Sequence, residues 1–264
     1  MNVDQKVDSQ PVSLDKFDEE GGSRRNLQSW NLKLAAIVAI SWSLFQLWYA
    51  SPLPYILNFG KIIDVPARSL HLAFGLVLCF LVYPALRSKK KSKISTSDFV
   101  LVFISLLVTL YIFFDYEGLV YRQGILAKIE FGSFVIPYEL IIGILGIVLL
   151  LEATRRAIGI PLVAIALIFI LFSIFGQSMP FLISHQGLSI TRLVGYHWFG
   201  GEAIFGIPIS VSVSFIFLFV LFGAILDTAG GGKYFINLAF ALVRGEQLRL
   251  PAQPEREDGD FASG

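Results

Sequence analysis

The sequence has few charges and almost no cysteine. Of its 264 residues, 16% are charged and 55% are hydrophobic, whereas soluble domains average about 25% charged and about 45–50% apolar residues. The single Cys79 cannot form an intrachain disulfide, and no cysteine spacing typical of a metal site is present. A formal net charge of +1 gives no reason to expect nucleic acid as a partner. The composition instead favours a chain embedded in a lipid bilayer.

The common motifs of enzyme chemistry are also absent. The sequence has neither the H-E-x-x-H motif of zinc proteases nor the G-x-S-x-G nucleophile elbow. The glycine run before Lys233 is not a phosphate-binding loop, because Asp227 occupies the first glycine position and Tyr234 follows the lysine. The 3 histidines do not have the spacing of a zinc site. We therefore expect no enzyme, no bound cofactor and no metal site in this chain.

Six apolar runs approach the length of a transmembrane helix, for which about 20 residues are needed to cross about 30 Å of hydrocarbon. The predicted spans are Leu32–Tyr49, Ser69–Leu86, Phe99–Phe114, Phe134–Thr154, Ala157–Phe175 and Ile204–Leu226. In the fourth run, Gly143 and Gly146 predict close helix packing. Residues 1–29 are polar and do not have the form of a cleavable signal, so we expect a disordered cytoplasmic N-terminus. The sequence therefore predicts an all-α, polytopic membrane protein with about six transmembrane helices.

The positions of lysine and arginine predict the orientation. If the N-terminus is inside, most of the 21 Lys and Arg residues fall on the cytoplasmic side, including the basic run at 87–93. The reverse topology would place that run outside. Trp30 at the inner edge of the first span, and Trp48 and Tyr49 at its outer edge, agree with aromatic residues at membrane interfaces. We expect an N-in/C-in, multi-pass protein of the bacterial inner (cytoplasmic) membrane.

Four further segments are too polar or too short to span. Asp115–Ser133 and Gln177–Gly201 are predicted outside loops, the second with a short interfacial helix around Ser189–Trp198. Lys233–Val243 is apolar but reaches only about 16 Å as a helix, so it is expected to lie along the inner surface or to fold against other helices. The polar residues 245–264 are predicted to form a disordered tail.

Four charged residues are the candidate site residues. Glu152 precedes Arg155 and Arg156 by three and four positions, which places them on one helical face. Two interpretations are open for them: an ion pair that anchors the helix at the interface, or a coupling contact between transport elements. Asp227 ends the sixth span, where an acid is either a water-exposed edge residue or a functional group. Gln46, a polar residue in the first span, is expected to form a hydrogen bond to a neighbouring helix, and the alternative is a place in the lining of a substrate path.

Several stretches resemble one family of transporters. They are Tyr116–Gly124 (YEGLVYRQG), Leu151–Gly159 (LEATRRAIG) and Phe205–Lys233 (FGIPISVSVSFIFLFVLFGAILDTAGGGK), which Phe235–Val243 (FINLAFALV) extends. In these stretches the chain resembles the fused 4TM/12TM permease of the tripartite ATP-independent periplasmic (TRAP) transporters, in the branch that uses TAXI-type binding proteins. The resemblance covers about half of the chain closely, and the first three helices match only in pattern.

The resemblance implies sodium-coupled uptake of an organic acid delivered by a TAXI-type periplasmic binding protein that docks on the outer face. Residues 30–157 would correspond to the four-helix small component and residues 158–244 to the beginning of the large one. The similarity stops near Arg244, so we expect a truncated N-terminal portion whose sodium and substrate sites lie outside this chain. No ion or substrate residue is carried over from the family.

Two roles remain open on this basis. As part of a TRAP permease, the chain would use Glu152, Arg155, Arg156 and Asp227 for structural coupling, and by itself it would show no sodium-dependent uptake. The alternative is a membrane scaffold or anchor subunit without transport activity of its own.

Overall fold

A computed structural model describes most of the chain between Arg25 and Gln247. The described residues are Arg25, Leu27, 30–85, 94–122, 125–131 and 134–247. The basic run at 87–93, most of the N-terminal segment 1–29 and residues 248–264 of the expected tail lie outside them. The chain divides into two units, Met1–Ile216 and Phe217–Gly264, and each is described by itself below.

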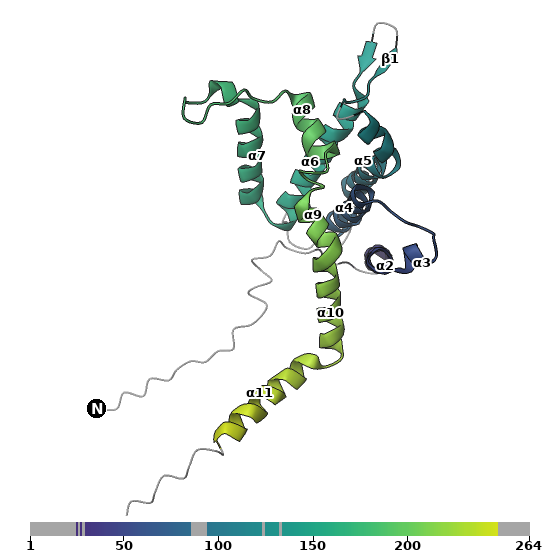
Figure 1. Ribbon diagram of the computed structural model, residues 1–264, viewed down its shortest axis with the longest axis vertical. Helices are drawn as coiled ribbons and strands as arrows, with labels where there is room; N and C mark the ends of the chain where they lie inside the picture. The colour runs from purple at the N-terminus through teal and green to yellow at the C-terminus, as the bar shows by residue number, and fades with distance from the viewer. Residues whose placement is uncertain are drawn as a thin grey trace, which may run out of the picture. The chain divides into compact units, whose positions relative to one another are not determined.

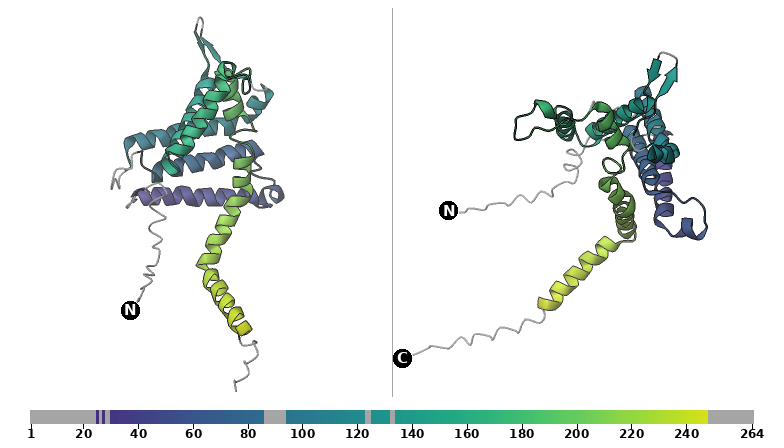
Figure 2. Two further views of the ribbon diagram at one scale, coloured as in Figure 1. Left: turned by 90° about the vertical axis from the view of Figure 1, so that its left-hand side faces the viewer. Right: turned by 45° about the horizontal axis from the view of Figure 1, so that its top comes forward.

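Three long helices form the centre of the first unit. They are α2 (Trp30–Ala50), α4 (Asp64–Val82) and α5 (Thr96–Tyr121), with the short α3 (Leu53–Ile56) after α2. Each of the three is long and apolar enough to cross a membrane. α4 packs against both α2 and α5, which appear as neighbouring purple-to-blue helices in the left view of Figure 2. With 56% of its apolar window buried, against 11% for α2 and 28% for α5, α4 is the central helix.

A β-hairpin and a second group of helices follow in this unit (Figure 1). Their bounds are β1 (Ile129–Phe131), β2 (Phe134–Ile136), α6 (Tyr138–Ala157), α7 (Ile160–Ile174), the 3-10 turn η1 (Gly176–Ser178), α8 (Ile190–Val194) and the π-helix η2 (Gly195–Phe199). β1 and β2 pair antiparallel. Between α6 and α7, Gly159 has φ 128°, a conformation that favours glycine, and Pro161 lies in the first turn of α7. These two residues allow α6 to end and α7 to begin within a very short connection.

The predicted role of Gly143 and Gly146 in close packing is confirmed. Both lie on the face of α6 that contacts α8 and η2. A Cβ added at Gly143 would overlap the side chain of Val194, and one at Gly146 would overlap the indole of Trp198. Trp198 is fully buried. The two glycines therefore allow a large aromatic side chain to lie directly against the backbone of α6.

The last part of the chain is one apolar stretch of helix followed by an amphipathic one. α9 (Ile207–Val211) and the π-helix η3 (Ser212–Ile216) end the first unit. The second unit holds α10 (Phe217–Thr228) and α11 (Gly231–Gln247). Ile207–Thr228 is long and apolar enough to span a membrane. Together with α2, α4 and α5, this stretch makes the protein a polytopic, all-α membrane protein, as predicted.

Two of the six predicted spans are not as long and apolar as these four helices. α7 is apolar but has 15 residues, about 22 Å of helix. α6 has 20 residues but carries charged residues in its first and last turns. Four helices of the described chain thus qualify as spans by length and hydropathy alone.

Several predicted boundaries are corrected by the structure. The third helix does not stop at Phe114: it continues to Tyr121 through a kink at Asp115 (φ −108°, ψ 18°), so the start of the expected loop is helical. Phe134–Ile136 is a strand rather than the start of the fourth helix, because Pro137 precedes the helix as its N-cap. α11 includes residues 245–247, which the sequence placed in the polar tail. The short helix expected around Ser189–Trp198 is present as α8 and η2.

Candidate functional site

Five charged side chains gather where α4 ends, α5 begins and α6 ends. We call Arg25, Asp98, Glu152, Arg155 and Arg156 the ion cluster. Asp98 accepts hydrogen bonds from Arg25 Nη2 at 2.6 Å and from Arg156 Nη1 at 2.8 Å. Glu152 accepts from Arg156 Nε at 2.7 Å and from Arg155 Nε and Nη2 at 2.7 and 2.8 Å. These charge-assisted bonds form one continuous network across segments that are distant in the sequence.

Backbone carbonyls just beyond or at the end of α4 accept further guanidinium hydrogens. Arg25 donates to the carbonyl of Leu81 at 3.3 Å, Arg156 to that of Tyr83 at 3.3 Å and Arg155 to that of Ala85 at 2.9 Å. The last carbonyls of a helix have no partner within the helix, and the negative end of its dipole attracts cations. The guanidinium of Arg156 also lies 5.0 Å from the ring centroid of Phe80 in α4. The cluster therefore joins the C-terminal end of α4 to α5 and α6.

The centre of the ion cluster is shielded from water. The side chains of Arg25, Asp98 and Arg156 are each 2% exposed. Charges removed from water are tolerated when they are paired and hydrogen-bonded. Both carboxylates of the cluster form salt bridges, each to two guanidiniums. This arrangement holds helix ends together and leaves no carboxylate ready to accept a proton from a substrate.

The structure brings together three of the four predicted site residues. Glu152 pairs with both Arg155 and Arg156, as their spacing predicts. Asp227 lies in the second unit, exposed near the C-terminal end of α10. Sequence reasoning missed Asp98, although its place three residues after Ser95 is the signal of a capping box, and its carboxylate does accept the Ser95 N–H at 3.3 Å.

A second charged group lies at the other end of α6. We call Tyr111, Asp115, Arg122 and Glu139 the Glu139 cluster. The carboxylate of Glu139 is fully buried and accepts from Arg122, from the Tyr111 hydroxyl at 2.6 Å and from the backbone N–H of Ala127. Arg122 Nη2 also donates to Asp115 at 2.7 Å, and hydrogen bonding to Asp115 raises the pKa of Arg122. This group connects the kink in α5 and the segment before β1 to the start of α6.

The two clusters explain how α6 can carry four charged residues. Glu139 and Arg156 are separated by 17 positions, about 26 Å along a helix. That separation approaches the hydrocarbon thickness of a bilayer, about 30 Å. The residues between them are mostly apolar, and the charges at each end are paired. α6 therefore has the arrangement of a spanning helix even though its overall hydropathy is lowered by its ends.

Several polar side chains within the apolar helices are paired with one another or with backbone. Gln46 Nε2 in α2 donates to the carbonyl of Val213 in η3 at 2.9 Å, which confirms the expected hydrogen bond to another helix. The indole N–H of Trp42 donates to His71 Nδ1 at 3.1 Å. The hydrogen of a neutral His71 is then on Nε2, from which it points to Ser212 Oγ at 3.1 Å. These contacts fasten α2 and α4 to the π-helical turn η3.

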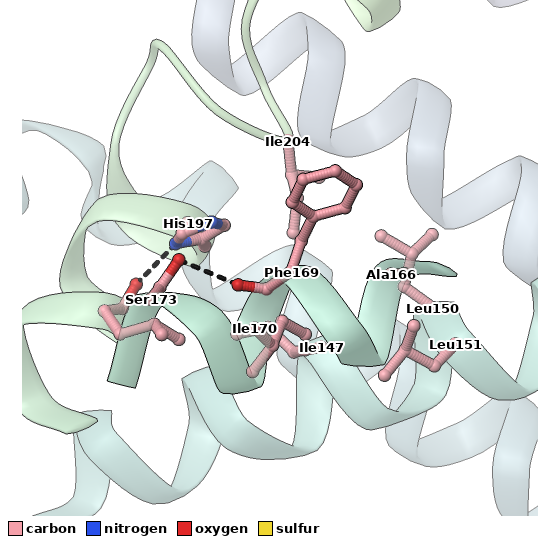
Figure 3. Close-up of a pocket in the computed structure, with 10 residues that line it drawn as sticks. Ile147, Leu150, Leu151, Ala166, Phe169, Ile170, Ser173, His197 and Ile204 are labelled. Atoms are coloured by element: carbon pink, nitrogen blue, oxygen red, sulfur yellow. Dashed lines mark hydrogen bonds between the residues drawn. The ribbon is translucent and has the colours of Figure 1, made fainter. Parts of the chain in front are cut away.

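An apolar cavity of about 250 Å³ lies between α6, α7 and the segment that contains α8 and η2 (Figure 3). Most of its lining is aliphatic, and Phe169 and Ile204 close one part of it. Each of its two polar side chains already donates to a backbone carbonyl: Ser173 Oγ to that of Phe169 at 2.9 Å, and His197 Nδ1 to that of Leu193 at 2.9 Å. The cavity thus presents hydrocarbon rather than charge.

The described residues include no group of three or more His, Cys, Asp or Glu side chains that could hold a metal ion. Cys79 is a free cysteine whose thiol donates to the Ala153 carbonyl at 3.4 Å. His185 and His197 are each engaged with a backbone carbonyl, at 3.0 and 2.9 Å. These side chains serve local packing.

The apolar helices define the class first: this is a polytopic, all-α membrane protein. Residues 145–247 match the family model described as "Tripartite ATP-independent periplasmic transporter, DctM component". The matched segment runs from α6 to the last residue of α11 and contains Glu152, Arg155, Arg156 and Asp227. It supports a membrane permease component of a TRAP transporter, which is a transport component and not an enzyme. Comparison with curated proteins and with solved structures gives no match.

Proposed function

We propose that this chain is a membrane permease component of a TRAP transporter of the TAXI branch. In this role it takes part in sodium-coupled uptake of an organic acid that a TAXI-type periplasmic binding protein delivers. The observation that carries the proposal is the match of residues 145–247 to the DctM component. The resemblance of Tyr116–Gly124, which precedes the matched segment, supports the branch and the fused arrangement.

The ion cluster has a place in this proposal. It lies directly before the Gly159 turn, and its residues Glu152, Arg155 and Arg156 fall within the segment that matches the DctM component. By joining α6 to α4 and α5, the cluster fixes the position from which α7 begins. We assign Glu152, Arg155 and Arg156 a structural-coupling role on this ground.

The distribution of Lys and Arg gives the orientation of the chain. The protein lies in the bacterial inner membrane, with both ends of the chain on the cytoplasmic side. In this orientation the ion cluster is cytoplasmic and the β1–β2 hairpin faces the periplasm. The hairpin lies between Arg122 and Glu139 of the Glu139 cluster, and the Glu139 carboxylate accepts the backbone N–H of Ala127 just before the hairpin. The periplasmic face is the side on which a binding protein would dock.

Docking can be measured with the chain in lipid nanodiscs and a purified TAXI-type binding protein. We expect saturable binding that empty nanodiscs do not show. Lys128→Glu, which reverses an exposed charge next to β1, should weaken binding several-fold, because charges at the rim of an interface change association. Lys33→Glu, an equal charge change at the opposite end of the bundle, should leave binding unchanged. Absence of binding would contradict the proposal and would favour a scaffold without a transport role.

A further inference from the structure

A second cavity lies beside the ion cluster, where the residues after α4 meet the turn between α6 and α7. Its volume is about 470 Å³, within the range of roughly 300–1,000 Å³ that is common for small-molecule sites. The side chains of Arg155 and Arg156 line it, and none of the described residues in its lining is acidic. We call it the arginine cavity.

The two guanidiniums keep unused donors after the ion cluster has formed. Arg155 donates from Nε and Nη2 to Glu152, and from Nη2 to the carbonyl of Ala85. Arg156 donates from Nε to Glu152, and from Nη1 to Asp98 and a backbone carbonyl. Within the described part of the chain, Nη1 of Arg155 and Nη2 of Arg156 therefore have no acceptor, although the Arg156 side chain is only 2% exposed.

The surroundings of the arginine cavity carry excess positive charge. The ion cluster contains three guanidiniums and two carboxylates, which leaves one positive charge unbalanced. α7 begins at the cavity wall, and its N-cap Gly159 has no side chain to accept the N–H groups of the first turn. The partial positive charge of this helix end adds to that of the arginines. Guanidinium groups match the oxygens of phosphate in geometry as well as in charge, so the cavity suits a phosphate anion.

The depth of the cavity indicates that a lipid supplies the anion. Arg156 lies 17 positions after Glu139, about 26 Å along α6, which places the cavity at the edge of the hydrocarbon layer. Lipid phosphates lie at this level, and basic pockets between transmembrane helices bind anionic headgroups. Ile158 and Ile160 in the cavity lining are 64% and 69% exposed. Acyl chains would cover these side chains, whereas a soluble anion would leave them in contact with water.

We propose that the arginine cavity binds the phosphate of an anionic phospholipid. Arg155 Nη1 and Arg156 Nη2 donate to the phosphate oxygens, and the acyl chains lie along Ile158 and Ile160. The lipid then contacts both the end of α6 and the start of α7. The proposal rests on the ion cluster and on the membrane class of the protein, and it does not require the transport function.

Binding is measured by native mass spectrometry of the full chain, freed of lipid in a neutral detergent. Phosphatidylglycerol and phosphatidylcholine with identical acyl chains are titrated separately. We expect the first phosphatidylglycerol to bind about 10-fold more tightly, because the ammonium group of phosphatidylcholine brings a further positive charge to the arginines.

Two variants change the site in different ways. Arg155→Gln removes one guanidinium, whereas Ala85→Phe fills the cavity and keeps every charge of the ion cluster. Each should weaken phosphatidylglycerol binding by about 10-fold and abolish the preference over phosphatidylcholine. Arg192→Gln, an equal charge change at an exposed residue of α8, is the matched control and should keep the preference. Tryptophan fluorescence checks the fold of each variant, and Ala85→Phe decides the test if Arg155→Gln does not fold.

Three results would overturn the proposal. Equal affinity for the two lipids would show that the site does not select an anionic lipid. A preference that persists in either folded variant would place the lipid elsewhere on the protein. Displacement of phosphatidylglycerol by an equal concentration of glycerol 3-phosphate would show that the cavity holds a soluble anion instead of a lipid.

Discussion

Asp98→Asn removes the negative charge that two buried guanidiniums of the ion cluster share. The Asp98 side chain is 2% exposed and lies 2.6 Å from Arg25 Nη2 and 2.8 Å from Arg156 Nη1. Removing one partner of a buried ion pair costs about 3–5 kcal/mol, because the other charge stays buried and uncompensated. Arg156 keeps Glu152 as a partner, so we expect the lower value, about 3 kcal/mol. That corresponds to about a 10²-fold shift in the unfolding equilibrium.

The assay is unfolding of the purified protein in mixed micelles, with denaturing detergent as titrant and tryptophan fluorescence as readout. Glu117→Gln is the matched control, since it neutralises an exposed carboxylate in the same helix and should change stability by less than about 0.5 kcal/mol. Combining Asp98→Asn with Arg25→Gln should cost less than the sum of the two single changes, because the double variant no longer leaves a buried guanidinium at position 25 without its carboxylate. The reasoning is refuted if Asp98→Asn costs no more than Glu117→Gln, or if the two changes at the cluster simply add.

Three further predictions concern packing, the Glu139 cluster and topology. Gly146→Ala should destabilise the protein by about 1–3 kcal/mol through overlap with the buried indole, whereas Gly223→Ala, with no atom near its added Cβ, should be neutral in the same unfolding titration. Glu139→Gln leaves its guanidinium partner without a buried carboxylate, so amide exchange of residues 125–131 and 134–136 should accelerate by about 10-fold or more; unchanged exchange would argue against the cluster as support of the hairpin. Lys90→Cys in a chain carrying Cys79→Ala should not react with an impermeant maleimide added to intact cells. Labelling from outside would contradict the N-in/C-in topology.

The local features of this protein are readable from its sequence. Glu152 and Arg156 are four positions apart on one helix, so their salt bridge follows from helical spacing alone. Gly143 and Gly146 of α6 likewise predict close packing, although the sequence does not identify the side chain that packs against them. Asp98 could not be found in this way, because its guanidinium partners are 58 and 73 positions away and meet it only through the packing of α4, α5 and α6.

The ends of α5 and α6 were also difficult to predict, for a related reason. Asp115 and Glu139 are polar residues that normally indicate a loop or a helix boundary. In the folded chain both carboxylates are hydrogen-bonded by Arg122, so α5 continues past Asp115. Whether a polar residue ends a helix depends on a partner that the local sequence does not identify.

The long sequence separations within the ion cluster have a consequence for synthesis in the membrane. Arg25 leaves the ribosome 73 residues before Asp98, a delay of about 4–15 s at roughly 5–20 residues per second. Asp98 in turn precedes Arg156 by 58 residues. Arg25 therefore waits for its carboxylate until the start of α5 has been translated, and Asp98 waits for its second guanidinium until the end of α6 has been translated, so the network is completed only when α6 is made.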